Sequence, residues 1–272
     1  MKTIFLAVLC LFSTFLLSAQ DDEGTWDAYM AAYEDDNPGS TILRMDLIEK
    51  APLKEYSKLL ITGVTYKSNR EDGFPDKEML QTLYEINDKL EALLKKHFEI
   101  IYVGSFTYNY ERLGYYYIKS DKNLEKKLQK FYKKNYPGFK SQITIKEDIE
   151  WKAYTEFLYP SEEILGYMYN KKVVKALYDA GDLLTEKRRI DHWLWFHDET
   201  KLKECISELE QLGYTIEGYK KVEERENLYS IQIWKNGLPD MENISAETSS
   251  LQVLAKKYDG EYDGWETIVV KK

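Results

Sequence analysis

The sequence predicts an α+β protein of two tandem domains, each with the element order β-α-β-β-α-β, behind a short N-terminal leader. Three observations lead to this prediction. The chain has 272 residues, which is more than one average domain contains. Its 43% hydrophobic and 31% charged residues are typical of a packed globular protein. Apolar residues recur along it with periods of two and of about 3.6, the periods of strands and of helices.

The leader has the layout of a secretory signal peptide. Lys2 supplies a positive start, and residues 4–17 form an almost unbroken apolar run that is short for a membrane span. Ser18-Ala19-Gln20 then offers small residues for cleavage. We therefore expect residues 1–19 to be removed and the protein to be exported to the periplasm or the medium of a bacterium, with an uncleaved anchor as the alternative. No later apolar run reaches membrane length.

The first domain is expected over residues 20–160. Two strands flank the turn Asp36-Asn37-Pro38-Gly39, a helix follows the N-cap candidate Asp76, and a hairpin flanks Asn109-Tyr110-Glu111. These signals predict strands at residues 26–34, 41–46, 58–67, 99–108, 112–119 and 142–147, and helices at 76–97, 123–134 and 151–158. Read from residue 58 to residue 147, the order is β-α-β-β-α-β.

The second domain is expected over residues 161–272, after the break at Tyr159-Pro160-Ser161. A helix at residues 162–184 precedes the same element order. Its strands are predicted at 189–197, 215–223, 228–235 and 265–270, and its helices at 199–212 and 246–258. The repeated order predicts two ferredoxin-like folds, in which a four-stranded antiparallel sheet carries two helices on one face.

The charge and the cysteine content narrow the classes of function that the sequence allows. The formal net charge of −9 argues against a protein that coats nucleic-acid phosphates. Cys205 is the single cysteine outside the leader, so no intramolecular disulfide is expected. It lies at helical spacing from Leu202 and Leu209, which favours a buried apolar role over a nucleophile.

The sequence from about residue 165 to 270 resembles the family of regulator of ribonuclease E activity B. The residues that carry the resemblance are Leu177, Ala180-Gly181-Asp182, Arg189, His192, Phe196, Leu212-Gly213-Tyr214 and Glu261-Tyr262-Asp263-Gly264-Trp265-Glu266. The resemblance implies a small acidic protein of ferredoxin-like fold that binds and inhibits ribonuclease E. That enzyme is cytoplasmic, so the predicted export implies the fold of the family without its named partner.

The sequence from about residue 25 to 158 resembles an uncharacterised bacterial family, domain of unknown function 695. The residues that carry this resemblance are Trp26, Tyr29, Asp72-Gly73-Phe74-Pro75, Val103-Gly104, Thr107, Arg112, Tyr116-Tyr117, Asp148, Trp151, Tyr154 and Leu158-Tyr159-Pro160. It implies no activity.

No catalytic or metal motif is recognisable: the chain has no H-E-x-x-H, C-x-x-C, G-x-S-x-G or phosphate-binding glycine loop. The densest polar cluster contains Asp191, His192 and His197. The two histidines are five residues apart on one predicted strand, so they point to opposite faces. We predict no catalytic, cofactor or metal site and a non-enzymatic protein. A hydrolase that uses Asp191, His192 and His197 is the alternative.

Aromatic residues form the clearest pattern in the second domain. Trp193 and Trp195 share one face of their strand, opposite Leu194 and Phe196, and Trp234 occupies a neighbouring strand. If the aliphatic faces pack on helices, the three tryptophans form a platform like that on which RNA-recognition domains stack bases. The acidic charge argues against RNA. The other domain, a second copy or a protein partner could cover such a patch.

The sequence therefore predicts an exported, non-enzymatic binding or regulatory protein that contacts its partner through Trp193, Trp195 and Trp234. Asp263 and Trp265 are second candidates, although their turn also has a structural explanation. The partner is expected to be a protein or a second copy, with no cofactor and no membrane span after cleavage. A cytoplasmic ribonuclease regulator is the alternative if the leader is not a signal peptide.

Overall fold

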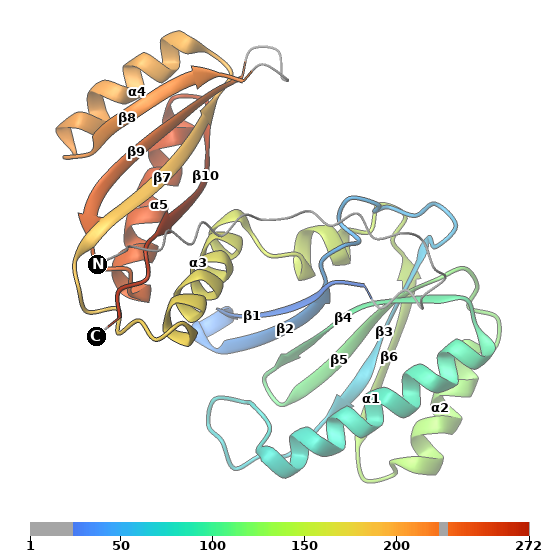
Figure 1. The fold of residues 1–272 in the computed structure, drawn as a ribbon. Coiled ribbons are helices and arrows are strands. Elements are labelled where there is room, and N and C mark those ends of the chain that lie inside the picture. The colour runs from blue at the N-terminus through green and yellow to red at the C-terminus, as the bar shows by residue number, and fades with distance from the viewer. Residues whose placement is uncertain (1–23, 223–227, 272) are drawn as a thin grey trace.

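The computed structural model describes residues 24–222 and 228–271, and the predicted leader lies outside them. It confirms an α+β protein with two antiparallel sheets (Figure 1). None of the helices in the described ranges is both long and apolar enough to cross a bilayer.

The first sheet has six strands in the order β1-β2-β4-β5-β3-β6. The strands are β1 (Trp26–Ala32), β2 (Pro38–Arg44), β3 (Lys58–Thr65), β4 (Ile100–Tyr108), β5 (Glu111–Ile118) and β6 (Lys140–Glu147). Helices α1 (Lys77–His97) and α2 (Leu124–Asn135) cover one face, where Leu90 and Leu128 pack with Leu60, Tyr116 and Ile118.

The opposite face of this sheet carries a second core, built around the π-helical turn η2 (Ala153–Leu158). The ring of Trp151 stacks on that of Tyr117 with 3.9 Å between their centroids. The Trp151 indole also donates a hydrogen bond to the Tyr56 carbonyl at 2.8 Å. Both faces of the first sheet are therefore used for packing.

A four-stranded sheet was the wrong prediction for this domain. Strand β2 pairs with β4, with Ile42 opposite Ser105, and β1 then pairs with β2. The short 3-10 turn η1 (Glu34–Asp36) joins β1 and β2. A free edge strand is a template for pairing with other chains, and this hairpin covers the edge that β4 would otherwise expose.

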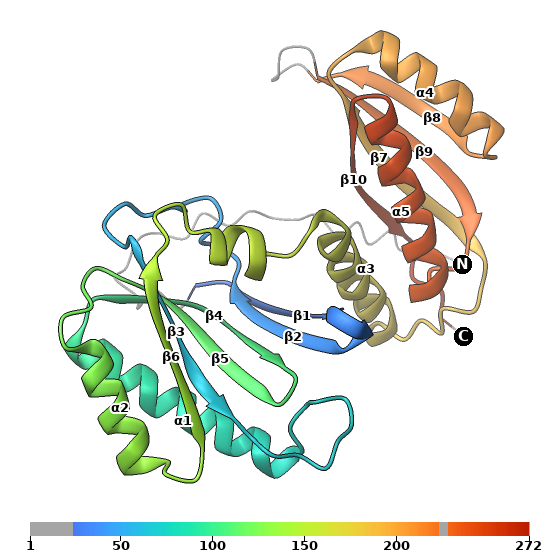
Figure 2. The same cartoon turned by 180° about the vertical axis from the view of Figure 1, so that it is seen from behind.

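The second sheet has four strands in the order β10-β7-β9-β8. The elements are β7 (Arg188–Phe196), α4 (Glu199–Gln211), β8 (Thr215–Lys221), β9 (Tyr229–Gly237), α5 (Met241–Lys257) and β10 (Gly260–Thr267). Helices α4 and α5 lie on one face, as Figure 2 shows from behind. Their core contains Leu194, Phe196, Leu202, Cys205 and Ile231, and burial raises the pKa of the Cys205 thiol to about 12.

Helix α3 (Glu162–Asp179) lies between the two sheets (Figures 1 and 2). Met168 joins the core of the first sheet, whereas Val174 and Leu177 pack against Ile190, Ile244 and Trp265 of the second. The helix ends five residues before the predicted residue 184. Gly181 has a φ of +89°, and the Asp182 N–H donates to the Leu177 carbonyl, which is the hydrogen bond of a Schellman cap.

Candidate functional site

The face of β7 that turns away from helices α4 and α5 carries two tryptophans. Burial alternates along β7: His192, Leu194 and Phe196 are buried, while Trp193 and Trp195 are partly exposed. Because successive side chains of a strand point to opposite faces, both tryptophans lie on the side without helices. The sequence-based prediction that they share this face is confirmed.

Trp234 joins them from the neighbouring strand β9. The antiparallel register places Trp193 opposite Gln232 and Asp191 opposite Trp234. Directly paired residues share a face, and diagonal neighbours two positions away are still within reach of aromatic side chains. Trp193, Trp195 and Trp234 therefore form one surface, which we call the aromatic face. The elements of the first domain lie away from it (Figures 1 and 2).

Charged groups border the aromatic face at its Trp234 end. The Arg189 guanidinium lies over the Trp234 ring, 4.8 Å from its centroid. Arg189 also donates to the Asp191 carboxylate at 2.6 and 2.9 Å and to Glu217 at 3.0 Å. Gln232 donates to Asp191 at 3.0 Å. Two carboxylates thus hold one guanidinium, so this border does not offer free positive charge to a phosphate.

The indole nitrogen of Trp234 is buried and has no hydrogen-bond partner among the described residues. An indole N–H is a donor that usually finds an acceptor when it is buried. The polar edge of the aromatic face is therefore not fully satisfied within the described part of the chain.

Trp265 does not lie on the aromatic face. It is 3% exposed, faces the helices opposite His192, and donates from its indole nitrogen to Asn170 Oδ1 of α3 at 2.8 Å. A bulge between Tyr262 and Gly264 shifts the register, which turns Trp265 inward. Its burial corrects the expectation of a partner contact at this residue. Asp263 lies exposed at the bulge and stays a prediction.

The fold separates the polar residues Asp191, His192 and His197, which the alternative prediction of a hydrolase would need together. Asp191 lies beside the aromatic face, whereas His192 is 0% exposed on the helix side. His197 is exposed beyond the strand end, and Asp198 caps α4 by accepting the N–H groups of Thr200 and Lys201. These groups do not converge on one reacting atom. Nor do any histidine, cysteine and carboxylate side chains gather as a metal site within residues 24–222 and 228–271.

His192 instead belongs to a buried network that the sequence did not reveal. Its Nδ1 lies 3.0 Å from the Tyr262 hydroxyl, and its Nε2 lies 3.6 Å from Glu247 Oε1. The Tyr214 hydroxyl donates to the same carboxylate oxygen at 2.9 Å. Burial alone would raise the pKa of Glu247, but His192 and Tyr214 outweigh it and hold the pKa below its usual value. The sequence does contain one sign of this network: Glu247 lies three residues after Ile244 and four before Leu251, which places it on the inward side of α5.

Fold and site together define an α+β protein with two antiparallel sheets, the second of which presents tryptophans on its helix-free face. Comparison with known proteins is consistent with this division. The chain belongs to the family of unknown function DUF695 over residues 24–159 and to the family Regulator of ribonuclease activity B over residues 168–267. Regulator of ribonuclease activity B from Salmonella typhi is 31% identical over 97 residues, which cover 35% of this chain and 70% of that protein.

One solved structure, of a protein assigned as a glycine cleavage system transcriptional repressor, aligns with 78% of this chain and 98% of its own. The identity is 10% and the TM-score 0.24, so this alignment supports no conclusion about fold or function.

Proposed function

We propose that the chain is an exported, non-enzymatic regulatory protein that binds a protein partner through the aromatic face of its second domain. The observation that carries the proposal is the position of Trp193, Trp195 and Trp234 on a sheet face that no described helix covers. Tryptophan and arginine are enriched among residues that dominate binding energy. The aromatic centre and the Arg189–Asp191–Glu217 border match the apolar core and polar rim of a protein interface.

The same surface is unsuited to nucleic acid. Arg189 is already held by Asp191 and Glu217, and Glu261 and Glu266 pair with β7 from the neighbouring strand β10. The chain as a whole carries a net charge of −9. Affinity for nucleic acid rests largely on cationic contacts to phosphates. The acidic residues around the aromatic face therefore favour a protein partner over RNA.

We assign a ferredoxin-like fold to each domain. In the first, the core strands run in the order β6-β3-β5-β4, and in the second they run β10-β7-β9-β8. Numbered within each β-α-β-β-α-β unit, both orders are 4-1-3-2, and both units place two helices on one face. The hairpin of β1 and β2 is an addition to the first unit. The domain boundary near Pro160 belongs to the same proposal.

The aromatic face is tested by substitution of two tryptophans. We expect the double variant Trp193→Ala/Trp195→Ala to lose at least tenfold in affinity for the partner, since truncation of a central interface residue costs about 2 kcal/mol or more. The measurement is affinity capture from the periplasmic fraction, with wild type and variant compared quantitatively in one experiment. Light scattering of the purified chain shows whether the partner is a second copy.

The matched control is Tyr178→Ala, which removes an aromatic side chain that is 67% exposed on α3. It should retain every partner of the wild type. If the double variant folds, captures the same proteins in the same amounts and keeps the same oligomeric state, the aromatic face is not the binding surface.

Export is tested by the mass of the native protein. We expect an N-terminus at Gln20 and recovery from the periplasm or medium. A soluble form that begins at Met1 in the cytoplasm would contradict export. It would favour the second candidate function, a cytoplasmic ribonuclease regulator, which rests on the match of residues 168–267 to Regulator of ribonuclease activity B.

A further inference from the structure

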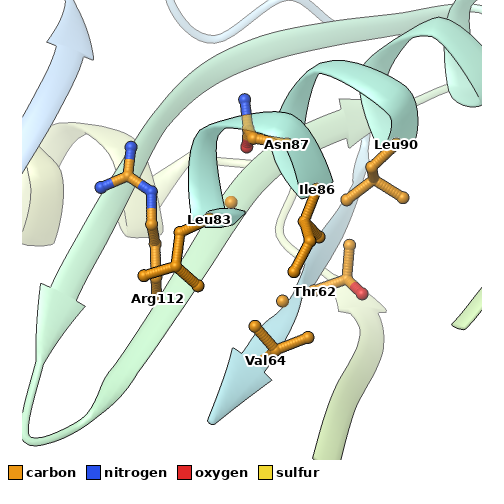
Figure 3. Close-up of a pocket in the computed structure, with 9 residues that line it drawn as sticks. Thr62, Val64, Leu83, Ile86, Asn87, Leu90 and Arg112 are labelled. Atoms are coloured by element: carbon orange, nitrogen blue, oxygen red, sulfur yellow. The ribbon is translucent and has the colours of Figure 1, made fainter. Parts of the chain in front are cut away.

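Two cavities in the described part of the chain are too small for a segment of a partner protein. One lies between α1 and the first sheet beside Arg112, and its volume of about 10 Å³ has room for one water-sized group (Figure 3). The other, of about 100 Å³, lies between α3 and α5, where Asn170 and Thr248 line it. The aromatic face, in contrast, is an open surface.

Carboxylates follow the edge strand β10 on the helix-free side of the second sheet. Glu261 lies directly opposite Trp195, and Glu266 lies directly opposite Asp191. Directly paired residues share a face, so both glutamates lie on the side of the aromatic face, and both are exposed. Asp263 lies exposed at the bulge between them. We call Glu261, Asp263 and Glu266 the acidic edge.

The acidic edge has no counter-charge of its own. None of its three carboxylates forms an ion pair within residues 24–222 and 228–271. On the same side of the sheet, Arg189 is held by Asp191 and Glu217, and Lys220 lies on β8, the strand at the opposite edge. Like charges directly opposite each other destabilise a sheet, as Glu266 and Asp191 do here. A cation supplied by another molecule would relieve this repulsion.

The Trp234 end of the aromatic face shows how an indole and a carboxylate hold a cation together. The Arg189 guanidinium lies 4.8 Å from the centroid of the Trp234 ring and donates to Asp191 at 2.6 Å. The face of an indole attracts a cation, and the carboxylate adds a charge-assisted hydrogen bond. Trp195 also has a carboxylate on the neighbouring strand, that of Glu261. Within the described residues, no cation lies over the Trp195 ring.

We infer that the aromatic face binds a basic segment of the partner protein, with arginine or lysine side chains over Trp193 and Trp195 and their charges paired to the acidic edge. The inference rests on the proposed function, since it names the chemistry of the partner which that function requires. The apolar stems of arginine and lysine pack on aromatic rings while their charged ends reach carboxylates. Alternate residues of an extended chain are about 7 Å apart, so a cation at every second position matches the spacing of the two tryptophans.

The experiment is calorimetric titration of the full chain with a blocked heptapeptide of alternating glycine and arginine. The wild type should bind this peptide at least about tenfold more tightly than the peptide in which uncharged citrulline replaces arginine. Glu261→Gln/Glu266→Gln should weaken binding of the arginine peptide by about tenfold and leave that of the citrulline peptide unchanged. The matched control, Glu71→Gln/Glu210→Gln, removes two exposed carboxylates from the loop before α1 and from α4, and it should bind like the wild type.

Equal binding of the arginine and citrulline peptides, or binding of neither, would overturn the inference. Equal weakening in Glu261→Gln/Glu266→Gln and in the control would overturn it as well, because it would show only a general attraction to an acidic chain.

Capture of the native partner separates this inference from the proposed function. If Trp193→Ala/Trp195→Ala loses the partner while Glu261→Gln/Glu266→Gln retains it, the aromatic face binds a partner that is not basic, and the inference alone is wrong. If both variants retain the partner, the inference and the proposed function are both wrong. Loss of the partner in both variants, together with the peptide preference, is the result that we expect.

Discussion

Replacement of Asp182 by Asn should destabilise the second domain by about 3 to 5 kcal/mol, because it leaves the buried Arg188 guanidinium without its carboxylate. Asp182 is 2% exposed and accepts hydrogen bonds from both Nη atoms of Arg188. It also accepts the N–H groups of Leu184 and Val270, so it joins the segment after α3 to the end of the chain. Urea unfolding followed by circular dichroism measures the change.

The matched control is Asp191→Asn, which breaks an ion pair whose arginine is 42% exposed. Exposed pairs contribute up to about 1 kcal/mol, so its free energy of unfolding should change little. Equal losses in the two variants would contradict a special role of the buried pair.

The Asp182–Arg188 ion pair also makes the free energy of unfolding depend on pH in the acid range. Burial alone would raise the pKa of Asp182, but Arg188 and the N–H groups of Val270 and Leu184 outweigh it and lower the pKa to about 2, from 3.8. A carboxyl whose pKa falls on folding stabilises the folded state above its unfolded pKa. That contribution, on the order of 2 kcal/mol, is lost as the pH falls from about 4 to about 2. In Asp182→Asn this part of the acid dependence should disappear.

The second large effect that we expect follows from Trp265→Ala. This variant should lower the free energy of unfolding by about 3 to 5 kcal/mol, since it removes a buried indole from the contact between β10 and α3. Trp265→Phe keeps most of the ring but leaves Asn170 Oδ1 without its donor, so it should cost about 1 to 3 kcal/mol. The measurement is again chemical unfolding, with partner capture recorded in parallel. Unchanged stability with reduced capture would restore Trp265 as a contact residue.

Local patterns allowed much of the fold to be predicted. The alternation along β7 depends only on neighbouring residues, so it correctly separated Trp193 and Trp195 from Leu194 and Phe196. The start of α1 was equally local, because the Asp76 side chain accepts the Met79 N–H at 2.9 Å.

The features that were missed depend on distant partners. Nothing within residues 26–44 indicates that their hairpin pairs with β4, about sixty residues further along the chain. The bulge at Tyr262 and Gly264 interrupts the alternation that would have shown Trp265 to point inward.

Helix α3 bears on how the two domains respond to one another. Its Met168 belongs to one core and its Val174 and Leu177 to the other, while Lys172 forms an ion pair with Asp27 of β1 at 2.5 Å. If α3 unfolded, apolar surface would become exposed in both cores. Unfolding should therefore be thermodynamically coupled across the domains. A ligand that stabilises either one should protect backbone amides of the other from hydrogen exchange.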